Sequence, residues 1–424
     1  MEYIKQLDVI GEYDIVIAGG GPGGIGAAIS AADMGMKVLI IERAGVVGGN
    51  ITIGHVSPLM GRYIPNTMAD YIIRYLSDDN KPDCNAEEAK IRLTALLDEK
   101  GIDVYLNTSL CDVIRADNKI KSIVISTQSG LKAVNGKVFI DGTGDGVLSS
   151  LAGEKTEYGR EDGLVQPMSI MFTIGGIAPD QKLTCYHEED ETPLKKGGYL
   201  QMCRDACKKG ELPPEVNIIR LYPGQNSDER VVNATQTNGY NPLELSEYNK
   251  AQVALRRQMK MVVDFLKNNV EGFENVFIKD SSDIVGVRES RRVIGQYVLD
   301  ADSLIDGRPF EDVIVHKADF PIDIHNPAGA GQAESETLPV STQKYDIPYR
   351  CIVPLVNENL FLSGRCISGT HRAHASYRVM NIVLNVAEAA GIAAALCIKN
   401  GETNKTLGYK EVQKVLNEKG IELF

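Results

Sequence analysis

The chain has 424 residues, which is long for a single hydrophobic core and favours two domains. Its composition, 43% hydrophobic and 24% charged, is that of an ordinary globular protein. The formal net charge of −12 argues against a nucleic-acid-binding protein, because such proteins usually present a basic face.

Several segments bear on compartment and metal content. Residues 1–14 are acidic and lack a long apolar stretch, so we expect no signal peptide and a cytoplasmic location. The apolar run 381–398 contains Asn385 and Glu388, which favours a buried helix over a membrane span. The eight cysteines are scattered without a C-x-x-C motif, a pattern typical of free thiols. We therefore expect no metal site and no membrane partner.

Residues 13–42 have the pattern of one βαβ unit. The apolar run 13–19 is bounded by glycine and predicts a buried parallel strand. Residues 22–35 are rich in small side chains and predict a helix that ends near Gly35. A second buried strand is expected over 37–42, where the run ends on an acid.

The next segments continue in a different style. A helix is expected over 85–101, followed by three strand-like runs that end in a glycine cluster at 141–146. The residues "ADNK" at 116–119 are good hairpin chemistry between the first two runs. We therefore predict a three-stranded antiparallel meander after the βαβ unit.

The middle of the chain lacks the βαβ rhythm. Between about 155 and 345 the pattern predicts a helix near 246–269 and a long loop over 325–344. A buried strand over 359–365 and a long Ala-rich helix over about 376–399 then return to the style of the N-terminal part. The ends of the chain thus look alike, and the middle looks inserted.

The glycines after the first strand point to a ligand that the backbone must approach. Gly19, Gly21 and Gly24 fit G-x-G-x-x-G, with a strand before them and a helix after them. The helix N-terminus would present free N–H groups to a pyrophosphate. Glu42 lies eighteen residues beyond Gly24, where its carboxylate could accept hydrogen bonds from ribose hydroxyls. These residues predict a dinucleotide site.

Further glycine turns indicate which dinucleotide is bound. Glycine pairs or clusters recur at 48–50, at 141–146 and at 363–365. Four glycine-lined turns suggest a ligand larger than NAD that extends through the domain. We therefore expect FAD.

At this point the sequence resembles a known family. The blocks "GGGPGGIGAAISAADMGMKVLIIERAGVVGGN", "FIDGTGDGVLSSLAG", "VRESRRVIGQYVL" and "NLFLSGRCISGTHRAHASYRVMNIVLNVAEAAGIAAAL" are similar to the FAD-dependent oxidoreductase family, within the glutathione-reductase-like and succinate-dehydrogenase-like flavoproteins. The resemblance spans about residues 13–398. It implies an α/β fold: a Rossmann-like FAD-binding domain with a β-meander, formed by 1–160 and 345–424, and an inserted α+β substrate or cap domain over 161–344.

The resemblance also implies a role for individual residues around FAD. Those expected at the pyrophosphate and the adenosine ribose are Gly19, Gly21, Gly24 and Glu42. Those expected along the ribityl and phosphate path, or closing over the cofactor, are Arg43, Gly48, Gly49, Asn50, Gly144, Asp145, Gly364 and Arg365. Those expected at the flavin ring are Thr52, Arg378, Met380 and Asn381, and Val113 is expected to contact adenine through its backbone.

One residue departs from the family pattern. The terminal helix carries Glu388 where the family usually has a glycine. A buried carboxylate is costly unless it is paired, so either this helix face is open or a nearby cation binds Glu388. We also expect this helix to begin near Ser376 and to point its N-terminus at the flavin N1–C2=O edge, where it would favour reduction.

Candidates for catalysis cluster just before the terminal helix. The segment "GTHRAHASYR" brings His371, Arg372 and His374 within a few residues. Histidine supplies a base or proton donor, and arginine holds a carboxylate or carbonyl. The alternative is a polar loop whose cations cap helices or bind the cofactor diphosphate. His55 is a further candidate, because its loop follows the second glycine pair.

Other polar residues leave two interpretations open. Arg288, Arg291 and Arg292 would share one face if their segment were helical, and they could bind an anionic substrate or form internal ion pairs with Glu289. A second set could border the mouth of the active site: Asp323, His325, Asn326, Tyr349 and Arg350.

The sequence thus predicts an FAD-dependent oxidoreductase that transfers a hydride between flavin N5 and a small polar organic molecule, by hydroxyl oxidation or activated-alkene reduction. The alternative is a non-redox flavin-dependent isomerase or hydratase. The electron donor or acceptor is not indicated, and a homo-oligomer is compatible with the size of the chain.

Overall fold

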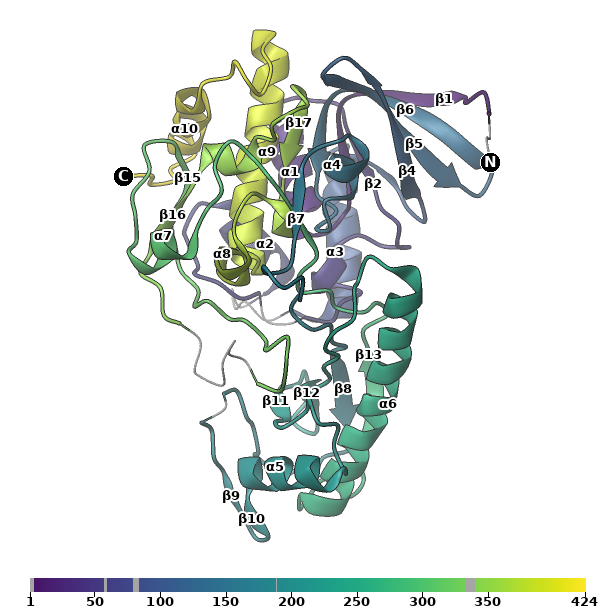
Figure 1. Ribbon diagram of the computed structural model, residues 1–424, viewed down its shortest axis with the longest axis vertical. Helices are drawn as coiled ribbons and strands as arrows, with labels where there is room; N and C mark the ends of the chain where they lie inside the picture. The colour runs from purple at the N-terminus through teal and green to yellow at the C-terminus, as the bar shows by residue number, and fades with distance from the viewer. Residues whose placement is uncertain (1–3, 57–58, 79–83, 188, 332–339) are drawn as a thin grey trace.

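The computed structural model describes residues 4–56, 59–78, 84–187, 189–331 and 340–424 (Figure 1). Its largest sheet in these residues has seven strands in the order β3-β2-β1-β6-β5-β4, with β17 beside β6. The strands are β1 (Val9–Ala18), β2 (Val38–Ile41), β3 (Asp103–Tyr105), β4 (Ser109–Ala116), β5 (Lys119–Thr127), β6 (Gly130–Asp141) and β17 (Leu360–Leu362).

The sheet combines a parallel part and an antiparallel meander. β1, β2, β3, β6 and β17 are parallel, whereas β4, β5 and β6 are antiparallel neighbours. The meander follows the prediction, and its first hairpin turns between Ala116 and Lys119. The Rossmann-like α/β fold expected from the sequence is therefore confirmed.

Side chains of β1 alternate between two buried layers. Ile15 and Ile17 pack in the main core with the helices, and Val16 packs on the other face with Ile123 and Ile125 of the meander. All five side chains are at most 1% exposed. A strand covered on both faces needs apolar residues at every position, which explains the uninterrupted apolar run.

Two helices with small side chains cover one face of the sheet. α1 (Pro22–Asp33) packs along α9 (Met380–Asn400). A Cβ added at Gly26 would lie 2.9 Å from Ala387 Cβ, and one added at Gly391 would overlap the carbonyl oxygen of Ala27. Glycine and alanine therefore let the N-terminal and C-terminal parts of the chain approach closely around the parallel strands.

The predicted terminal helix over 376–399 is two helices. α8 (His371–Tyr377) starts after Thr370, whose hydroxyl accepts a hydrogen bond from the Ala373 amide at 3.3 Å. α9 then begins at Met380, after Val379 in extended conformation. The expectation that one helix begins near Ser376 was wrong, because Ser376 lies inside α8. The predicted catalytic segment 369–378 thus forms a short helix of its own.

A second region has its own core and occupies the lower part of Figure 1. Its antiparallel sheet has the order β11-β12-β8-β13, and the helices α5 and α6 flank it. These elements are β8 (Phe172–Gly175), β11 (Arg220–Pro223), β12 (Arg230–Asn233), β13 (Phe277–Ser281), α5 (Tyr199–Lys209) and α6 (Leu245–Asn269). α6 confirms the helix predicted near 246–269.

The second core draws its residues from 168–285, a narrower range than the predicted 161–344. Val293, Val313 and Val315 pack in the main core instead, because they face the helices of the first region. The division into domains stays a prediction. Part of the predicted loop over 325–344, namely 332–339, lies outside the described residues.

The remaining elements connect and cover these two cores. They are α2 (Met68–Leu76), α3 (Ala86–Glu99), α4 (Val147–Leu151), α7 (Ala301–Ile305), α10 (Tyr409–Glu418), β7 (Thr156–Tyr158), β9 (Pro193–Leu194), β10 (Gly197–Gly198), β14 (Arg291–Val293), β15 (Val313–Ala318), β16 (Tyr345–Pro348) and the short 3-10 helices η1 (Gly49–Ile51), η2 (Tyr349–Ile352) and η3 (Gly364–Cys366).

α9 is the helix among the described residues that is long and apolar enough to cross a membrane, and 94% of its most apolar window is buried in the protein. The burial explains its composition, because a helix surrounded by the core is apolar on every side.

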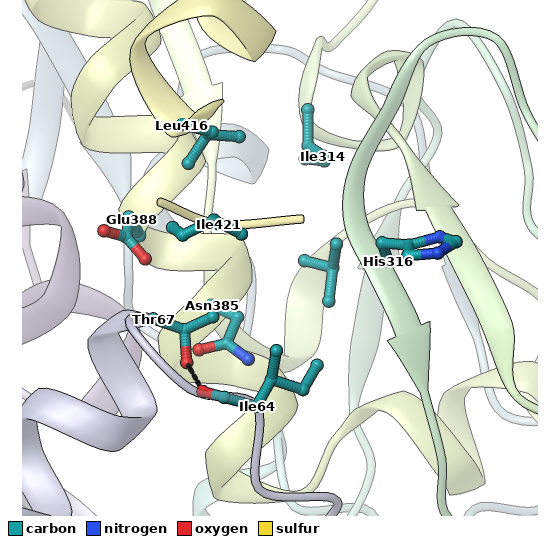
Figure 2. A pocket seen from close by; sticks show the side chains of 9 residues that line it. Ile64, Thr67, Ile314, His316, Asn385, Glu388, Leu416 and Ile421 are labelled. Atoms are coloured by element: carbon teal, nitrogen blue, oxygen red, sulfur yellow. Dashed lines mark hydrogen bonds between the residues drawn. The ribbon is translucent and has the colours of Figure 1, made fainter. Parts of the chain in front are cut away.

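Glu388 of α9 is paired with both a helix end and a cation. Figure 2 shows Asn385 and Glu388 beside a small cavity, next to Thr67 at the start of α2. The Met68 amide donates to Glu388 Oε2 at 2.8 Å, and Lys419 Nζ contacts Glu388 Oε1. Asn385 Oδ1 accepts from the next amide of α2 at 3.1 Å. The departure from the family pattern therefore caps α2 and ties down the C-terminal segment.

We expect Lys419→Met to lower the free energy of unfolding by about 1–3 kcal/mol at pH 7, because it leaves a buried carboxylate without its cation. Burial raises the pKa of Glu388, so its protonation favours the folded state. The loss should therefore be largest near neutral pH and shrink as the pH falls toward about 4. Urea unfolding across this pH range measures it.

The matched control is Lys414→Met on α10, where the side chain is exposed. This variant should change stability little at any pH. A second variant, Glu388→Gln, should make the Lys419→Met substitution nearly neutral in a double-mutant cycle. Additive losses in that cycle would contradict the ion pair.

Candidate functional site

The first glycine turn contains two structural glycines and one that faces open space. Gly19 has a φ of +96°, and an added Cβ would lie 2.5 Å from Gly142 O. A Cβ at Gly24 would overlap the carbonyl oxygen of Gly19. Gly21, in contrast, has a φ of −77°, and an added Cβ would meet only Gly49 Cα, at 3.9 Å. The fold requires Gly19 and Gly24, whereas Gly21 keeps a space open.

That open space lies at the N-terminus of α1. Gly21 is the N-cap of this helix and supplies no side-chain hydrogen bond to it. The first N–H groups of α1 are thus available to an anion, and the helix dipole favours negative charge there. This arrangement fits the pyrophosphate of a dinucleotide.

Two further glycine turns converge on the same helix end. The Gly48 amide donates to Gly20 O at 2.7 Å. From the C-terminal part of the chain, Ser363 Oγ donates to Gly23 O at 2.9 Å, and an added Cβ at Gly364 would meet only Gly23 Cα at 4.0 Å. Segments near residues 20, 48 and 364 therefore meet at one place, as the glycine pattern predicts for an extended cofactor.

Glu42 organises the loop around this turn. Its Oε2 accepts from the Gly20 amide at 2.6 Å, and its Oε1 accepts from the Ala44 amide at 2.8 Å. The adjacent Arg43 is exposed. The predicted contact of Glu42 with ribose stays a prediction. The strand that starts beside Glu42 is β4, because the Thr108 amide donates to Glu42 O at 2.9 Å, while Val113 lies further along that strand.

Asn50 and Thr52 hold the second glycine turn in shape. Thr52 is fully buried, and its hydroxyl donates to Val47 O at 2.7 Å. An added Cβ at Gly48 would overlap the Thr52 side chain, and one at Gly54 would lie 2.6 Å from Asn50 Cα. The hydroxyl of Thr52 is therefore used within its own loop, and its predicted place beside the flavin ring remains untested.

Asp145 and Arg365 join the third and fourth glycine turns. Arg365 Nη2 donates to Asp145 Oδ1 at 2.7 Å, and Ser290 Oγ donates to the same oxygen at 2.7 Å. An added Cβ at Gly144 would lie 2.8 Å from Arg365 Nη1. Arg365 Nε is buried and has no hydrogen-bond partner among the described residues. A donor in this position fits a phosphate or ribityl oxygen.

The start of α9 carries the residues predicted at the flavin ring. Asn381 Nδ2 donates to Leu59 O at 3.0 Å and to Gly61 O at 2.9 Å, so this side chain holds the 59–61 segment. Its Oδ1 has no partner in the described part of the chain. Met380 is buried as the first residue of α9, and this helix also lacks a side-chain cap.

His371 is oriented by a buried carboxylate. Its Nδ1 lies 2.8 Å from Oε1 of Glu289, which is 0% exposed. The same carboxylate accepts from Arg292 Nη1 at 2.6 Å and from the Gln166 amide at 3.1 Å. Arg292 thus neutralises Glu289, and Glu289 fixes the imidazole ring.

His374 has different surroundings, although it lies on the same short helix. It is 1% exposed and makes an edge contact with the Tyr377 ring at 5.6 Å between centroids. Burial, followed by the positive charges of Arg292 and Arg378, lowers the pKa of His374 well below its usual value. Its Nδ1 is buried and lacks a hydrogen-bond partner among the described residues. This imidazole is therefore neutral at physiological pH.

The other two predicted catalytic residues lie in different settings. Arg372 is exposed on α8. His55 has a φ of +50°, and its Nδ1 lies 3.4 Å from Asp280 Oδ1 in β13. Nearby, the Asp283 amide donates to Ile53 O at 3.0 Å. His55 therefore lies where the second glycine turn meets the second sheet.

The segment 287–292 is not helical, so its three arginines do not share a helix face. Arg292 forms the internal ion pair with Glu289, which was one of the two interpretations. Arg291 donates from Nε to Asp145 O at 3.0 Å and lies in β14. Arg288 donates from Nη1 to Pro167 O at 2.8 Å. Only Arg288 remains as a candidate for an anionic substrate.

The residues expected at the mouth of the site divide into two groups. Asp323 contacts Arg378, whose Nη2 lies 3.3 Å from Asp323 Oδ2, and His325 Nε2 lies 3.7 Å from the same oxygen. Arg350 instead forms an ion pair with Asp312 at 2.9 Å. The first group therefore lies beside the end of α8.

Tyr349 and Arg350 border an open cleft of about 840 Å³ near α10. Asn326 belongs to neither group, because its side chain accepts from the Ala328 amide at 2.9 Å and thus holds its own turn.

Sequence reasoning missed three residues of this site. Glu289 was considered only as a partner for neighbouring arginines, although it orients His371. Gln166 and Arg220 carried no signal, because isolated polar residues in irregular or strand segments match no motif. A buried polar side chain becomes visible only when the fold shows what surrounds it.

Comparisons with known proteins agree with the geometry. The family described as FAD dependent oxidoreductase matches residues 14–416. Thiamine thiazole synthase of Methanococcus vannielii is 31% identical over 177 residues, which are 37% of this chain and 65% of that protein. Mitochondrial dihydrolipoyl dehydrogenase of Schizosaccharomyces pombe is 26% identical over 237 residues, which are 52% of this chain and 42% of that protein. The chain therefore spans only 42–65% of the length of these relatives.

Two solved structures share the fold. OxyS anhydrotetracycline hydroxylase from Streptomyces rimosus has a TM-score of 0.50 at 12% identity, covering 96% of this chain and 66% of that chain. The p-nitrophenol 4-monooxygenase PnpA from Pseudomonas putida DLL-E4 has a TM-score of 0.50 at 11% identity, covering 95% and 83%. At such identities the likeness concerns the fold alone. Because the family match covers most of the chain, this protein belongs to the FAD dependent oxidoreductases and takes FAD as its cofactor.

Proposed function

We propose that this chain transfers a hydride between N5 of FAD and a small polar organic substrate, by oxidising a hydroxyl group or reducing an activated alkene. The observation that carries the proposal is the 2.8 Å contact between His371 Nδ1 and the buried Glu289 carboxylate. A histidine oriented in this way is suited to general acid–base chemistry. FAD, when bound, supplies the two-electron chemistry, and the chain supplies orientation and proton transfer.

The residues that would hold FAD are those whose backbone or side chain faces open space at the glycine turns. Gly21 leaves room at the N-terminus of α1, and Gly364 leaves room beside it. Arg365 retains a buried donor nitrogen. These features suit a diphosphate and its attached chain, because each would otherwise leave a cavity or an unsatisfied donor.

We assign His371 as the proton-transfer residue. A carboxylate only accepts hydrogen bonds, so Glu289 favours the tautomer with the proton on Nδ1 and makes Nε2 the basic nitrogen. Glu289 also stabilises the imidazolium that forms when Nε2 accepts a substrate proton. In the opposite direction, the imidazolium would donate this proton to a substrate carbon or oxygen.

The other candidates suit this role less well. His374 faces arginines instead of a carboxylate, so its protonation is disfavoured. It can still donate or accept a hydrogen bond as a neutral group. Arg372 is exposed, and His55 already contacts Asp280. We therefore retain His55, His374 and Arg372 as candidates for substrate positioning and not for proton transfer.

We expect Gly21→Val to weaken FAD binding by more than tenfold, or about 1.4 kcal/mol, while the apoprotein keeps its stability. The new side chain would fill space that the protein itself does not use. Flavin absorbance after dialysis against excess FAD measures occupancy, and urea unfolding of the apoprotein measures stability.

Gly408→Val is the matched control, because Gly408 is also an N-cap glycine, with a φ of −75° and no atom near an added Cβ. It should retain FAD. Full occupancy in the Gly21→Val protein would refute the assignment of the cradle.

We expect His371→Ala to slow flavin reduction by substrate by about 10²–10⁴-fold, with FAD retained, because the proton acceptor is lost. Glu289→Gln should have a smaller effect in the same direction, because the imidazole keeps a neutral partner. The measurement is anaerobic stopped-flow bleaching of the flavin with a panel of hydroxy and unsaturated substrates.

His187→Ala is the control, since His187 is exposed in the second region. Unchanged bleaching by the His371→Ala protein would exclude His371 as the base. Turnover of a substrate without any bleaching, and without an electron acceptor, would instead support the isomerase or hydratase alternative.

A further inference from the structure

We propose that the junction between the second sheet and α8 binds a carboxylate group of the substrate through the guanidinium groups of Arg220, Arg288 and Arg378. We refer to these three residues as the arginine cluster. This inference rests on the proposed function, because it assigns the substrate of that same redox site to the small hydroxycarboxylic acids.

The arginine cluster joins three elements that are distant in the sequence. Arg220 is the first residue of β11 and is 4% exposed. Arg288 precedes β14 and is held by its hydrogen bond to Pro167 O at 2.8 Å. Arg378 follows α8, and its Nη2 donates to Asp323 O at 3.1 Å. Two members of the cluster thus extend from the second region and one from the helix that carries His371.

The positive charges of the cluster lie close enough to disturb one another. Burial, followed by the charge of Arg378, lowers the pKa of Arg288 to about 9, and Arg220 acts in the same direction. Asp323 opposes this shift, but it is a single carboxylate facing three guanidinium groups. Burying like charges in this way is costly unless an anion joins them.

The other acidic group near the cluster is already engaged. The charge of Glu289 raises the pKa of Arg378, yet its carboxylate is bonded to Arg292 and to His371. Arg365 adds a further positive charge on this side. The described residues around the cluster therefore carry an excess of positive charge, which a ligand carboxylate would balance.

His325 does not add to this charge. Burial, followed by the charges of Arg288, Arg220 and Arg378, lowers the pKa of His325 well below its usual value. Its neutral ring lies 3.7 Å from Asp323. The cluster has thus already suppressed the one nearby group that could gain a proton, as expected for a site of strong positive potential.

Buried polar atoms without partners show which chemical groups are missing. Gln166 is 0% exposed, and its Oε1 accepts from the His325 amide and from Arg378 Nη2, each at 3.4 Å. Within the described residues, Gln166 Nε2 and Arg378 Nε are buried donors without a hydrogen-bond partner, and Asp323 Oδ1 is a buried acceptor without one. Two donors call for a carboxylate, and the acceptor calls for a hydroxyl.

The test uses the FAD-loaded protein and three small probes at constant ionic strength. Malonate carries carboxylates alone, malate adds a hydroxyl, and dimethyl malonate is neutral. Each is titrated while the absorption spectrum of the oxidised flavin and the thermal unfolding midpoint are recorded. We expect malonate and malate to bind, malate more tightly, and the ester to have no effect. Arg288→Met should weaken malonate binding by at least tenfold.

Two further variants keep the test decisive if Arg288→Met fails to fold. Arg220→Met removes one of the like charges and should also weaken malonate binding at least tenfold. Gln166→Glu replaces a donor by a negative charge at nearly equal volume and should do the same. Arg257→Met, an exposed position on α6, should bind malonate as the unmodified protein does.

Three results would overturn the inference. They are equal binding of the ester and the acids, unchanged malonate binding in the cluster variants, or an altered flavin reduction potential in those variants with unchanged anion binding, which would assign the arginines to the cofactor. Bleaching of the flavin by a neutral alcohol, without competition from malonate, would likewise reject the carboxylate site while leaving the proposed function intact. Absence of bleaching by any substrate, with malonate still bound, would reject the proposed function instead.

Discussion

The fold depends on a close approach of backbone to backbone at the first turn. The carbonyl oxygen of Gly19 occupies the place where a side chain on Gly24 would lie, and Gly142 closes the other side. Strands β1 and β6 and helix α1 can meet only because these positions carry no Cβ. Once they meet, the N-terminus of α1 is held in one position, and every other glycine turn is arranged around it.

A second constraint is electrostatic and concerns the end of α8. His371 and His374 lie three residues apart on this helix, yet their environments have opposite character. Glu289 faces the first, and arginines surround the second. One short helix therefore presents an imidazole that can gain a proton beside one that stays neutral. The break between α8 and α9 makes this possible, because a single continuous helix would leave no separate N-terminus at Met380.

Much of the first region could be predicted from the sequence, since its signals are local. Apolar runs, glycine spacing and hairpin residues determine β1, α1 and the meander, and these elements follow the prediction. The break before Met380 was not predicted, because no glycine or proline marks it. The site was less accessible. Arg220 and Gln166 belong to no motif, and Arg292 differs from Arg288 only in what the fold places beside it.

The charge distribution explains why the two regions are joined by polar residues and not by an apolar interface. An apolar junction would be cheaper to bury, yet here the junction holds Arg220, Arg288 and Arg378 with one facing carboxylate. Such an arrangement weakens the junction without a ligand and strengthens it when an anion enters. Ligand charge would then contribute to the closure of the second region over the flavin, so that binding of the substrate and exclusion of water become the same event.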